Sequence, residues 1–263
     1  MIQYRISSLV QTRSSNAPST PSAGADWLSR RLSAITFLKS AARVDQLPRP
    51  TAPEFAIAGR SNAGKSTTLN VLCQRRRLAF ASKTPGRTRL INLFGLFDKD
   101  EEIGRLVDLP GYGYAAVSKV MQKQWQLELS RYLATRPNLM GLILVCDCRH
   151  PLSALDTQLL AWFGPRQRPI HILLTKADKL GRQQQAQTLS AVNSLIKERM
   201  GQWGGSVSAS LFSGLKQTGR GELLEKLADW LGQKKASSEA TGDNAFVKAP
   251  AQGGEAGDMT SVV

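Results

Sequence analysis

A glycine-bracketed loop at residues 59–66 limits what this chain can fold into more than any other stretch. The loop follows the short apolar segment 55–58 and precedes a helical pattern, so we expect a strand, a loop and a helix in that order. Its sequence fits G-x-x-x-x-G-K-[ST], the phosphate-binding loop. Glycines let backbone N–H groups approach phosphate oxygens, and the helix start adds partial positive charge. The pattern predicts a nucleotide site in which Lys65 reaches the β- and γ-phosphates and Ser66 ligates Mg²⁺.

A strongly basic balance narrows the choice of partner. The 263 residues carry a formal net charge of +15 at pH 7, which favours nucleic acid or, alternatively, acidic membrane lipid. The longest apolar run, 142–146, is far shorter than the roughly 18 residues that cross a bilayer, so we expect no stable membrane insertion. Cys73, Cys146 and Cys148 match neither a disulfide framework nor a zinc pattern, and we interpret them as core thiols in a reducing compartment.

The two ends of the chain differ from its middle in composition. Residues 1–25 are rich in Ser, Thr, Pro and Ala and contain no acidic residue, and residues 236–263 are rich in Ala, Gly, Ser and charge. Segments of this kind cannot bury a core. We therefore predict a disordered basic N-terminal extension at 1–25, a folded domain at 26–235 and a disordered tail at 236–263. The first segment also resembles an organelle transit peptide, an alternative to an extension of a bacterial protein.

Between these ends, strand patterns alternate with helical patterns. We expect strands at 55–58, 91–97, 105–108, 141–147, 170–174 and 207–211. We expect helices at 26–40, 67–73, 118–135, 153–163, 183–200 and 219–231. The short turn between the second and third strands indicates an antiparallel hairpin. Together these elements predict an α/β fold: a six-stranded, mostly parallel sheet with one antiparallel edge strand and helices on both faces.

Three further stretches follow predicted strands and indicate a guanine nucleotide. Asp108 can hold Mg²⁺ through water, and Gly111 can offer its N–H to a γ-phosphate. Residues 175–178 end a parallel strand, and Asp178 can accept hydrogen bonds from guanine N1–H and N2–H₂, a donor pair that adenine lacks. A backbone N–H in segment 212–216 can meet the guanine O6. In this order along the chain, the stretches predict a site for GTP at the carboxyl ends of the strands.

The motifs at 59–66, 83–88, 108–114, 147–151 and 175–178 together make residues 40–231 similar to the EngB family. This family comprises bacterial GTPases of the translation-factor-related class. The resemblance implies a P-loop GTPase domain of the Ras-like type that binds GTP and GDP with Mg²⁺. It also implies a nucleotide switch in assembly of the large (50S) ribosomal subunit, needed for normal cell division and septation. We accordingly expect a cytoplasmic bacterial protein that is a monomer.

The resemblance assigns a role to each matching residue. The phosphates would be bound by Gly59, Arg60, Ser61, Asn62, Ala63, Gly64, Lys65 and Ser66. The first switch would comprise Gly86, Arg87, Thr88, Arg89 and Leu90, and the second Asp108, Leu109, Pro110 and Gly111. Guanine would be held by Thr175, Lys176, Ala177, Asp178, Phe212, Ser213 and Gly214. Mg²⁺ would be ligated by Ser66 and Thr88, and the catalytic residues would be Lys65, Thr88 and Gly111. Gly214 departs from the family, where we expect a second Ser.

Two residues bear on the mechanism. Many small GTPases have Gln directly after the D-x-x-G glycine to orient the attacking water. Tyr112 stands there in this chain and cannot reproduce the amide, so we predict slow intrinsic hydrolysis, with catalysis supplied by another group or by the assembling ribosome. Asn62 occupies the position that, in related potassium-dependent GTPases, helps ligate a monovalent cation near the β/γ bridge. A role for K⁺ is therefore an open alternative.

Basic residues around the first switch suggest how the nucleotide could control RNA binding. Lys83, Arg87 and Arg89, together with residues 75–77, can form a surface whose shape changes with the bound nucleotide. Contacts of this kind with ribosomal RNA should weaken steeply with salt. The rival interpretation is a GTP-gated scaffold that acts directly at the division septum or membrane rather than on the ribosome. An organelle homologue with a transit peptide is a third.

Overall fold

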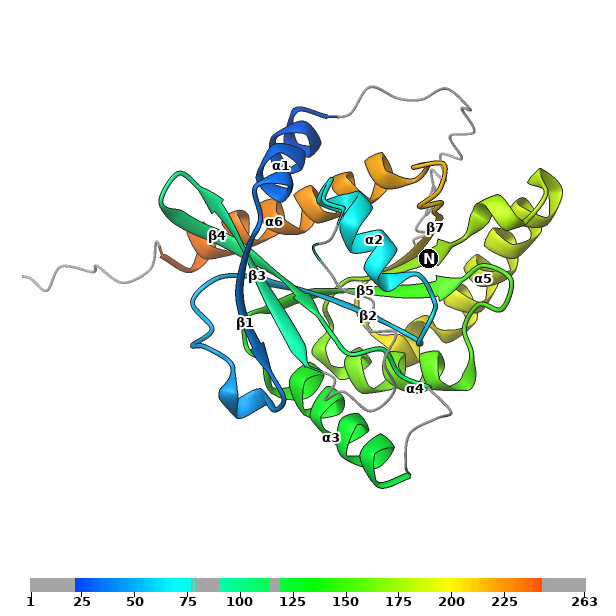
Figure 1. Cartoon of the computed structure of the whole chain (residues 1–263), viewed down its shortest axis with the longest axis horizontal. Helices are drawn as coiled ribbons and strands as arrows, with labels where there is room; N and C mark the ends of the chain where they lie inside the picture. The colour runs from blue at the N-terminus through cyan, green and yellow to red at the C-terminus, as the bar shows by residue number, and fades with distance from the viewer. Residues whose placement is uncertain (1–21, 77, 79–89, 114–118, 243–263) are drawn as a thin grey trace, which may run out of the picture.

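The centre of the molecule is a seven-stranded sheet, seen in a computed structural model that describes residues 22–76, 78, 90–113 and 119–242. The strands lie in the order β1–β3–β4–β2–β5–β6–β7 (Figure 1). Their bounds are β1 (Thr36–Ala41), β2 (Glu54–Gly59), β3 (Ile91–Asp98), β4 (Glu101–Asp108), β5 (Leu139–Asp147), β6 (Ile170–Thr175) and β7 (Val207–Leu211). The predicted α/β class is confirmed.

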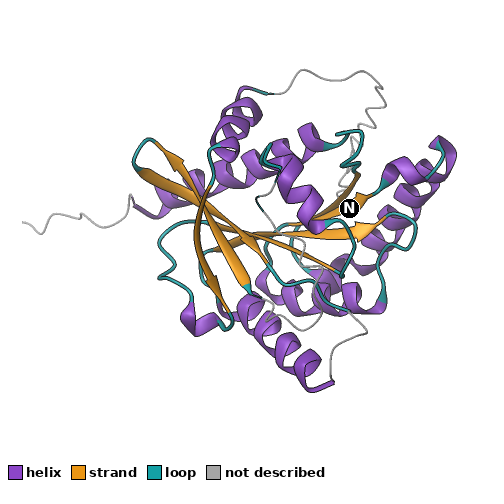
Figure 2. Cartoon of the chain, in the orientation of Figure 1, coloured by secondary structure: helices purple, strands orange, loops and turns teal. Residues whose placement is uncertain are grey.

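Helices cover both faces of the sheet, as predicted (Figure 2). They are α1 (Ala23–Ser33), α2 (Lys65–Leu72), α3 (Lys119–Thr135), α4 (Ala154–Phe163), α5 (Arg182–Trp203) and α6 (Arg220–Gly242). Short 3₁₀ helices lie in the connections at Val44–Gln46, Gly164–Arg166 and Ala177–Lys179. The last helix, expected at 219–231, continues to Gly242. The domain boundaries at 25 and 235 stay predictions.

The sheet agrees with the predicted topology in one respect and differs from it in two. β3 runs antiparallel to both of its neighbours, β1 and β4, and the remaining ladders are parallel. One antiparallel strand in a mostly parallel sheet was expected. However, the sheet has seven strands rather than six. The antiparallel strand is also second from the edge, because β1 covers it.

The additional strand comes from a segment predicted as helix. Apolar residues up to Leu38 fit helical spacing over 26–40, but α1 ends at Ser33 and β1 begins at Thr36. β1 pairs with β3 from Thr36 opposite Gly95 to Ala41 opposite Ile91. Continuing the helix would leave the edge of β3 without backbone partners along this stretch, whereas the strand satisfies them.

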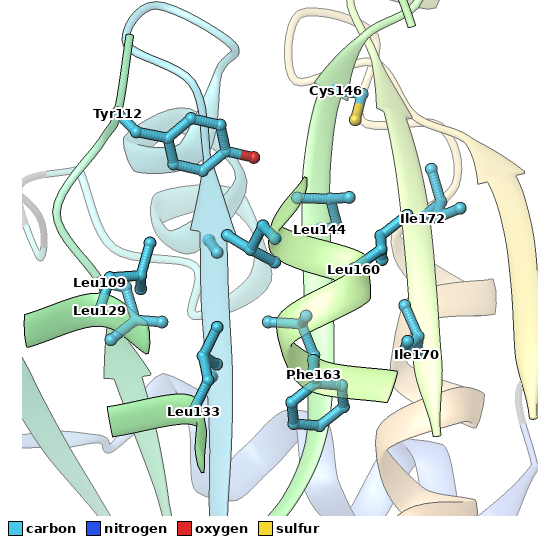
Figure 3. Packing of buried hydrophobic residues seen from close by; sticks show 14 of the residues in the cluster. Leu109, Tyr112, Leu129, Leu133, Leu144, Cys146, Leu160, Phe163, Ile170 and Ile172 are labelled. Atoms are coloured by element: carbon cyan, nitrogen blue, oxygen red, sulfur yellow. The ribbon is translucent and has the colours of Figure 1, made fainter. Parts of the chain in front are cut away.

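Two apolar cores lie on opposite faces of the sheet. Helices α1, α2 and α6 pack on one face, and α3, α4 and α5 pack on the other. Figure 3 shows part of the second core, where Leu129 and Leu133 of α3 and Leu160 and Phe163 of α4 face strand residues such as Leu144. Because β2 and β6 are buried on both faces, they read as continuous apolar runs rather than alternating ones.

The amino-terminal end of β2 is anchored by a buried ion cluster. Glu54 is fully buried and accepts hydrogen bonds from Arg136 Nη2 at 2.7 Å and Tyr132 Oη at 2.9 Å. Arg105 Nη1 lies 3.5 Å from the same carboxylate, and Arg105 Nε donates to Glu102 Oε1 at 2.6 Å. A buried charge is tolerated only when it is paired and hydrogen-bonded in this way. The cluster fixes the start of the strand whose other end carries the glycine-bracketed loop.

The composition predicted buried cysteines and no membrane-spanning segment. The three cysteines are buried, as interpreted from the sequence, and burial raises the pKa of the Cys73 thiol to about 12. No helix in the described ranges combines the length and the hydrophobicity of a membrane span.

Candidate functional site

The glycine-bracketed loop joins β2 to α2 in the middle of the sheet. A Cβ atom at position 59 would lie 2.5 Å from the carbonyl oxygen of Val145, so only glycine fits beside β5. Gly64 has φ of 104°, in the left-handed region that favours glycine, and it immediately precedes α2. Lys65 and Ser66 therefore lie in the first turn of the helix, where N–H groups without helical partners point toward the loop.

The second switch stretch is hydrogen-bonded to this loop. Ser61 N donates to Tyr112 O at 2.7 Å, and Tyr112 N donates to Gly59 O at 3.3 Å. Leu109 and Pro110, which lie between Asp108 and Tyr112 in the chain, are buried. The segment after Asp108 thus runs alongside the phosphate loop, which brings the two motifs together as expected.

An ion pair joins the two motifs at the side-chain level. Lys65 Nζ pairs with Asp108 Oδ1, and only 12% and 8% of the two side chains are exposed. Asn92 Nδ2 of β3 donates to the other carboxylate oxygen, Asp108 Oδ2, at 3.3 Å. The carboxylate is therefore held from two sides, in a position at which charged phosphate ligands could compete for Lys65.

The side chains here fit a Mg²⁺ ion that is bound together with phosphates. Mg²⁺ prefers oxygen ligands and usually takes one or two carboxylates, substrate phosphates and water. Ser66 supplies a hydroxyl and Asp108 a carboxylate. Within the described residues, no group of three or more His, Cys, Asp or Glu side chains could form a cage for a metal on its own. The residues thus suit a metal that arrives with the nucleotide.

The predicted guanine motif is fastened to the same loop. The Thr175 hydroxyl at the end of β6 donates to the carbonyl oxygen of Ala63. Lys176 Nζ donates to Asn62 O at 2.6 Å and lies 2.9 Å from Asp147 Oδ2. Hydrogen bonds from Arg149, and then from Lys176, hold the pKa of Asp147 below its usual range. The bridge from Lys176 to the phosphate loop was not expected from the sequence.

Two segments that were expected to hold the base lie side by side. Ala177 N donates to Phe212 O at 3.1 Å, and Ser213 Oγ donates to Asp178 Oδ1 at 2.6 Å. The Ser213 hydrogen bond lowers the pKa of Asp178, so the carboxyl group is ionised at neutral pH. An ionised carboxylate in this position can accept hydrogen bonds from guanine N1–H and N2–H₂.

Glycine at position 214, where we expected a second Ser, has a physical reason in this chain. A Cβ atom at position 214 would overlap Cγ2 of Thr67 in α2. Thr67 is β-branched, so making room would require it to change its χ1 rotamer. A glycine at 214 and a threonine at 67 are therefore complementary, and a serine at 214 would require a change in α2.

The Tyr112 side chain is part of the hydrophobic core. Its side chain is 3% exposed, its ring stacks on Trp125 of α3 with centroids 5.7 Å apart, and its hydroxyl donates to buried Asp156 at the start of α4. Burial raises the pKa of Tyr112 well above its ordinary value. In Figure 3 the ring lies beside β2, at one end of the group of apolar side chains. The residue that replaces the expected Gln therefore stabilises packing.

The structure brings together four of the predicted stretches, at residues 59–66, 108–111, 175–178 and 212–214, along the carboxyl edge of β2, β4, β6 and β7. Gly86, Arg87, Thr88 and Arg89 lie outside the described residues, and half-buried Leu90 leads into β3. The same holds for Arg77 and Lys83 of the expected basic surface. Arg75, in contrast, donates to Ser33 O at 2.8 Å and so braces α1. The roles assigned to these residues stay predictions.

Comparison with known proteins places the chain among GTP-binding proteins. The model of the family described as 50S ribosome-binding GTPase matches residues 54–176. The probable GTP-binding protein EngB of Methylobacillus flagellatus is 52% identical over 196 residues, or 74% of this chain and 91% of that protein. Its namesake from Aromatoleum aromaticum is 51% identical over 197 residues, or 74% and 87%.

Solved structures agree on the fold. The crystal structure of a probable GTP-binding protein EngB aligns with a TM-score of 0.53 at 18% identity, covering 68% of this chain and 99% of that one. The Era protein of Aquifex aeolicus, bound to GDP and aluminium fluoride, also gives 0.53 at 21% identity, over 68% of this chain and 56% of that one.

Proposed function

The chain belongs to the EngB family of GTP-binding proteins, and from this premise we propose that it is a Mg²⁺-dependent GTP switch in assembly of the large (50S) ribosomal subunit. It would act in the bacterial cytoplasm, and its loss would disturb cell division and septation. Two observations support a ribosomal partner: the matching family is described as 50S ribosome-binding GTPase, and the net charge of +15 suits binding to RNA. GTPase activity itself follows from the family.

The residues along the sheet edge would have separate roles in GTP hydrolysis: some would bind the phosphates and others Mg²⁺. We infer that Lys65 moves from Asp108 to the β- and γ-phosphates, where it offsets the charge that develops in the transition state. Gly111 donates its N–H to the γ-phosphate. Ser66 and Thr88 would hold Mg²⁺ directly, and Asp108 through water. When bound, Mg²⁺ neutralises charge on the β- and γ-phosphate oxygens.

Guanine would be selected by segments 175–178 and 212–214, which the hydrogen bond from Ser213 to Asp178 connects. Asp178 accepts two hydrogen bonds from the base, and Ser213 keeps the carboxylate in place. A backbone N–H of residues 212–214 would bind the guanine O6. Lys176, held by the loop carbonyl of Asn62, would cover the base and connect it to the phosphate site.

Slow intrinsic hydrolysis follows from the position of Tyr112, since its side chain packs against Trp125 and Asp156. A group from the ribosome would then orient the attacking water. Comparing single-turnover rates with and without 50S particles tests this: we expect stimulation, and fast turnover by the isolated protein would contradict it.

A monovalent cation is a separate proposal that rests on Asn62 in the phosphate loop. Its backbone has φ of 64°, and its carbonyl oxygen binds Lys176. If a K⁺ ion assists at the β/γ bridge, hydrolysis should be faster in KCl than in NaCl at equal ionic strength. Equal rates in the two salts would rule the cation out.

The convergence of Lys65, Asp108 and Asp178 on one sheet edge is the observation that carries the proposed switch. Its test is co-sedimentation with 30S, 50S and 70S particles in GDP or a non-hydrolysable GTP analogue. We expect the analogue to favour binding to 50S particles, and binding to fall steeply between about 50 and 200 mM salt. Asp178→Ala should lose the nucleotide dependence, whereas Lys197→Gln, exposed on α5, should keep it.

Another outcome of the same experiment would redirect the proposal. Nucleotide-dependent binding to membrane vesicles or division proteins, with none to ribosomal particles, would favour the GTP-gated scaffold at the septum.

A further inference from the structure

A row of three polar side chains crosses the sheet beside the phosphate loop. Ser40 of β1 pairs with Asn92 of β3 in the ladder, and Asn92 pairs with Asp108 of β4. Ser40 Oγ donates to Asn92 Oδ1 at 2.6 Å, and Asn92 Nδ2 donates to Asp108 Oδ2 at 3.3 Å. Residues directly opposite each other in neighbouring antiparallel strands have side chains close enough to bond in this way. The row therefore connects the edge strand with the carboxylate that pairs with Lys65.

Hydrogen-bonding capacity fixes the direction of the row. Asp108 Oδ2 is the acceptor in its bond with Asn92 Nδ2, so Asn92 presents its NH₂ group to Asp108. The amide oxygen of Asn92 then faces Ser40, whose hydroxyl can donate. Because a hydroxyl can donate or accept, Asp108 sets the orientation of the amide, and the bond from Ser40 holds the Asn92 side chain in place. In addition, Asn92 is flanked by buried Ile91 and Leu93, so this polar side chain interrupts an otherwise apolar strand.

The two oxygens of Asp108 have different partners. Oδ1 pairs with Lys65, and Oδ2 accepts from Asn92. When phosphates attract Lys65, Oδ1 loses its partner, while the bond between Oδ2 and Asn92 does not depend on Lys65. Without Asn92, the carboxylate could rotate about its Cβ–Cγ bond and present neither oxygen reliably.

We propose that Asn92 is a positioning residue that holds the Asp108 carboxylate in the orientation needed for Mg²⁺, and that Ser40 restrains the Asn92 side chain from the neighbouring strand. The proposal rests on the Mg²⁺ dependence stated above. Asn92 would touch neither the nucleotide nor the metal. It acts through Asp108, as residues behind the direct ligands of metal sites commonly do.

The test measures how Mg²⁺ slows the release of a fluorescent GDP analogue, so that it does not depend on hydrolysis. Removing a residue that orients a metal-site group typically costs 10- to 100-fold in metal affinity. We expect Asn92→Ala to raise the Mg²⁺ concentration for half-maximal retention by about 10-fold, at the lower end of that range. In EDTA its affinity for GDP should stay within about twofold of the wild type, since no nucleotide contact is lost.

Ser40 supplies a second variant with a matched control. Ser40→Ala should shift the Mg²⁺ requirement in the same direction by a smaller factor. Thr36→Ala removes a hydroxyl from the same strand outside the row and should have no effect. Because Ser40 is only partly buried on an edge strand, this pair keeps the test decisive where Asn92→Ala fails to fold.

The outcomes separate this role from a structural one. A wild-type Mg²⁺ requirement in folded Asn92→Ala, or in Ser40→Ala if only that variant folds, would overturn the proposal. Equal loss of GDP affinity with Mg²⁺ and with EDTA would overturn it too, because it would indicate general damage to the site. If the wild type itself retains GDP equally well in EDTA, the Mg²⁺ site proposed above fails together with the role of Asn92.

Discussion

Tyr112 illustrates how one residue can serve the fold at a position where other GTPases use a side chain in catalysis. Its ring and hydroxyl join the second switch stretch to Trp125 of α3 and Asp156 of α4. The sequence revealed that the usual Gln was replaced. It could not reveal where the replacement points, because that depends on helices far along the chain.

Restoring the amide should therefore not restore catalysis. We expect Tyr112→Gln to hydrolyse GTP no faster than the wild type, because the pocket around Tyr112 directs the side chain toward Asp156. The variant should also lose about 2–4 kcal/mol of unfolding free energy, because the shorter side chain no longer fills the space of the ring that packs on Trp125. Tyr112→Phe keeps the ring and should lose only about 1–2 kcal/mol. Single-turnover kinetics and urea unfolding measure both effects, and a tenfold faster Tyr112→Gln would contradict this account.

The buried His171, to which the sequence assigned no role, should make the free energy of unfolding depend on pH. The residue is fully buried, and its two ring nitrogens lie 2.9 Å from Ser208 Oγ and 2.9 Å from Ser210 Oγ. Burial, and next the charge of Lys226, lower the pKa of His171 to about 4. The ordinary value near 6.5 applies to the unfolded chain. The folded protein therefore keeps a neutral imidazole where the unfolded chain already binds a proton.

The sign of the effect follows from this difference. The contribution is complete above about pH 6.5 and falls as the pH drops toward 4, by at most roughly 3 kcal/mol. Urea unfolding at pH 7, 6 and 5 should show a decline in wild-type stability that is smaller in His171→Asn. The same slope in both proteins would assign the decline to other groups.

At the scale of elements, the sequence predicted the parallel strands and their helices well and failed at the edge. Strands β2, β5 and β6 are buried on both faces, so their apolar runs are unambiguous. β1 is exposed over most of its length and carries no alternation. Its pairing with β3 is a long-range contact, so local spacing favoured a longer helix instead.

The boundary between α1 and β1 can be tested with two leucines that both lie in the helix predicted over 26–40. Leu28 is 1% exposed on α1, which packs against α6, while Leu38 on β1 is 36% exposed. We expect Leu28→Ala to cost about 2–5 kcal/mol of unfolding free energy, because it leaves a cavity in the core. Leu38→Ala should cost much less. Equal costs, measured by urea unfolding, would support a continuous helix instead.

At the scale of the whole molecule, the site was predictable because topology places it. Carboxyl ends of parallel strands meet at one edge of a sheet, so motifs far apart in sequence must converge there. The contacts that lock them together were not predictable. The bonds from Lys176 to Asn62 and from Asn92 to Asp108 depend on side-chain directions that only the assembled sheet defines.

Because the predicted motifs converge at one edge of the sheet, a bound nucleotide should also stabilise the fold. A ligand that contacts the ends of β2, β4, β6 and β7 binds only the folded chain, and at about 1,000 times its Kd it adds about 4 kcal/mol to the free energy of unfolding. For a domain of this size, that raises Tm by roughly 8–16 °C. We expect GDP with Mg²⁺ to produce such a shift, and ADP at the same concentration to produce none, because ADP has no donor pair for Asp178.

Asp178→Ala is the control that connects this global effect with one side chain. The variant keeps the phosphate loop and its bond from Thr175 to Ala63, so phosphate contacts alone would still stabilise it if they dominated. We expect its GDP-induced shift in differential scanning calorimetry to fall to within about 2 °C of zero, which corresponds to less than about 1 kcal/mol. A shift equal to that of the wild type, or an ADP shift as large as that of GDP, would mean that the phosphates rather than the base determine binding.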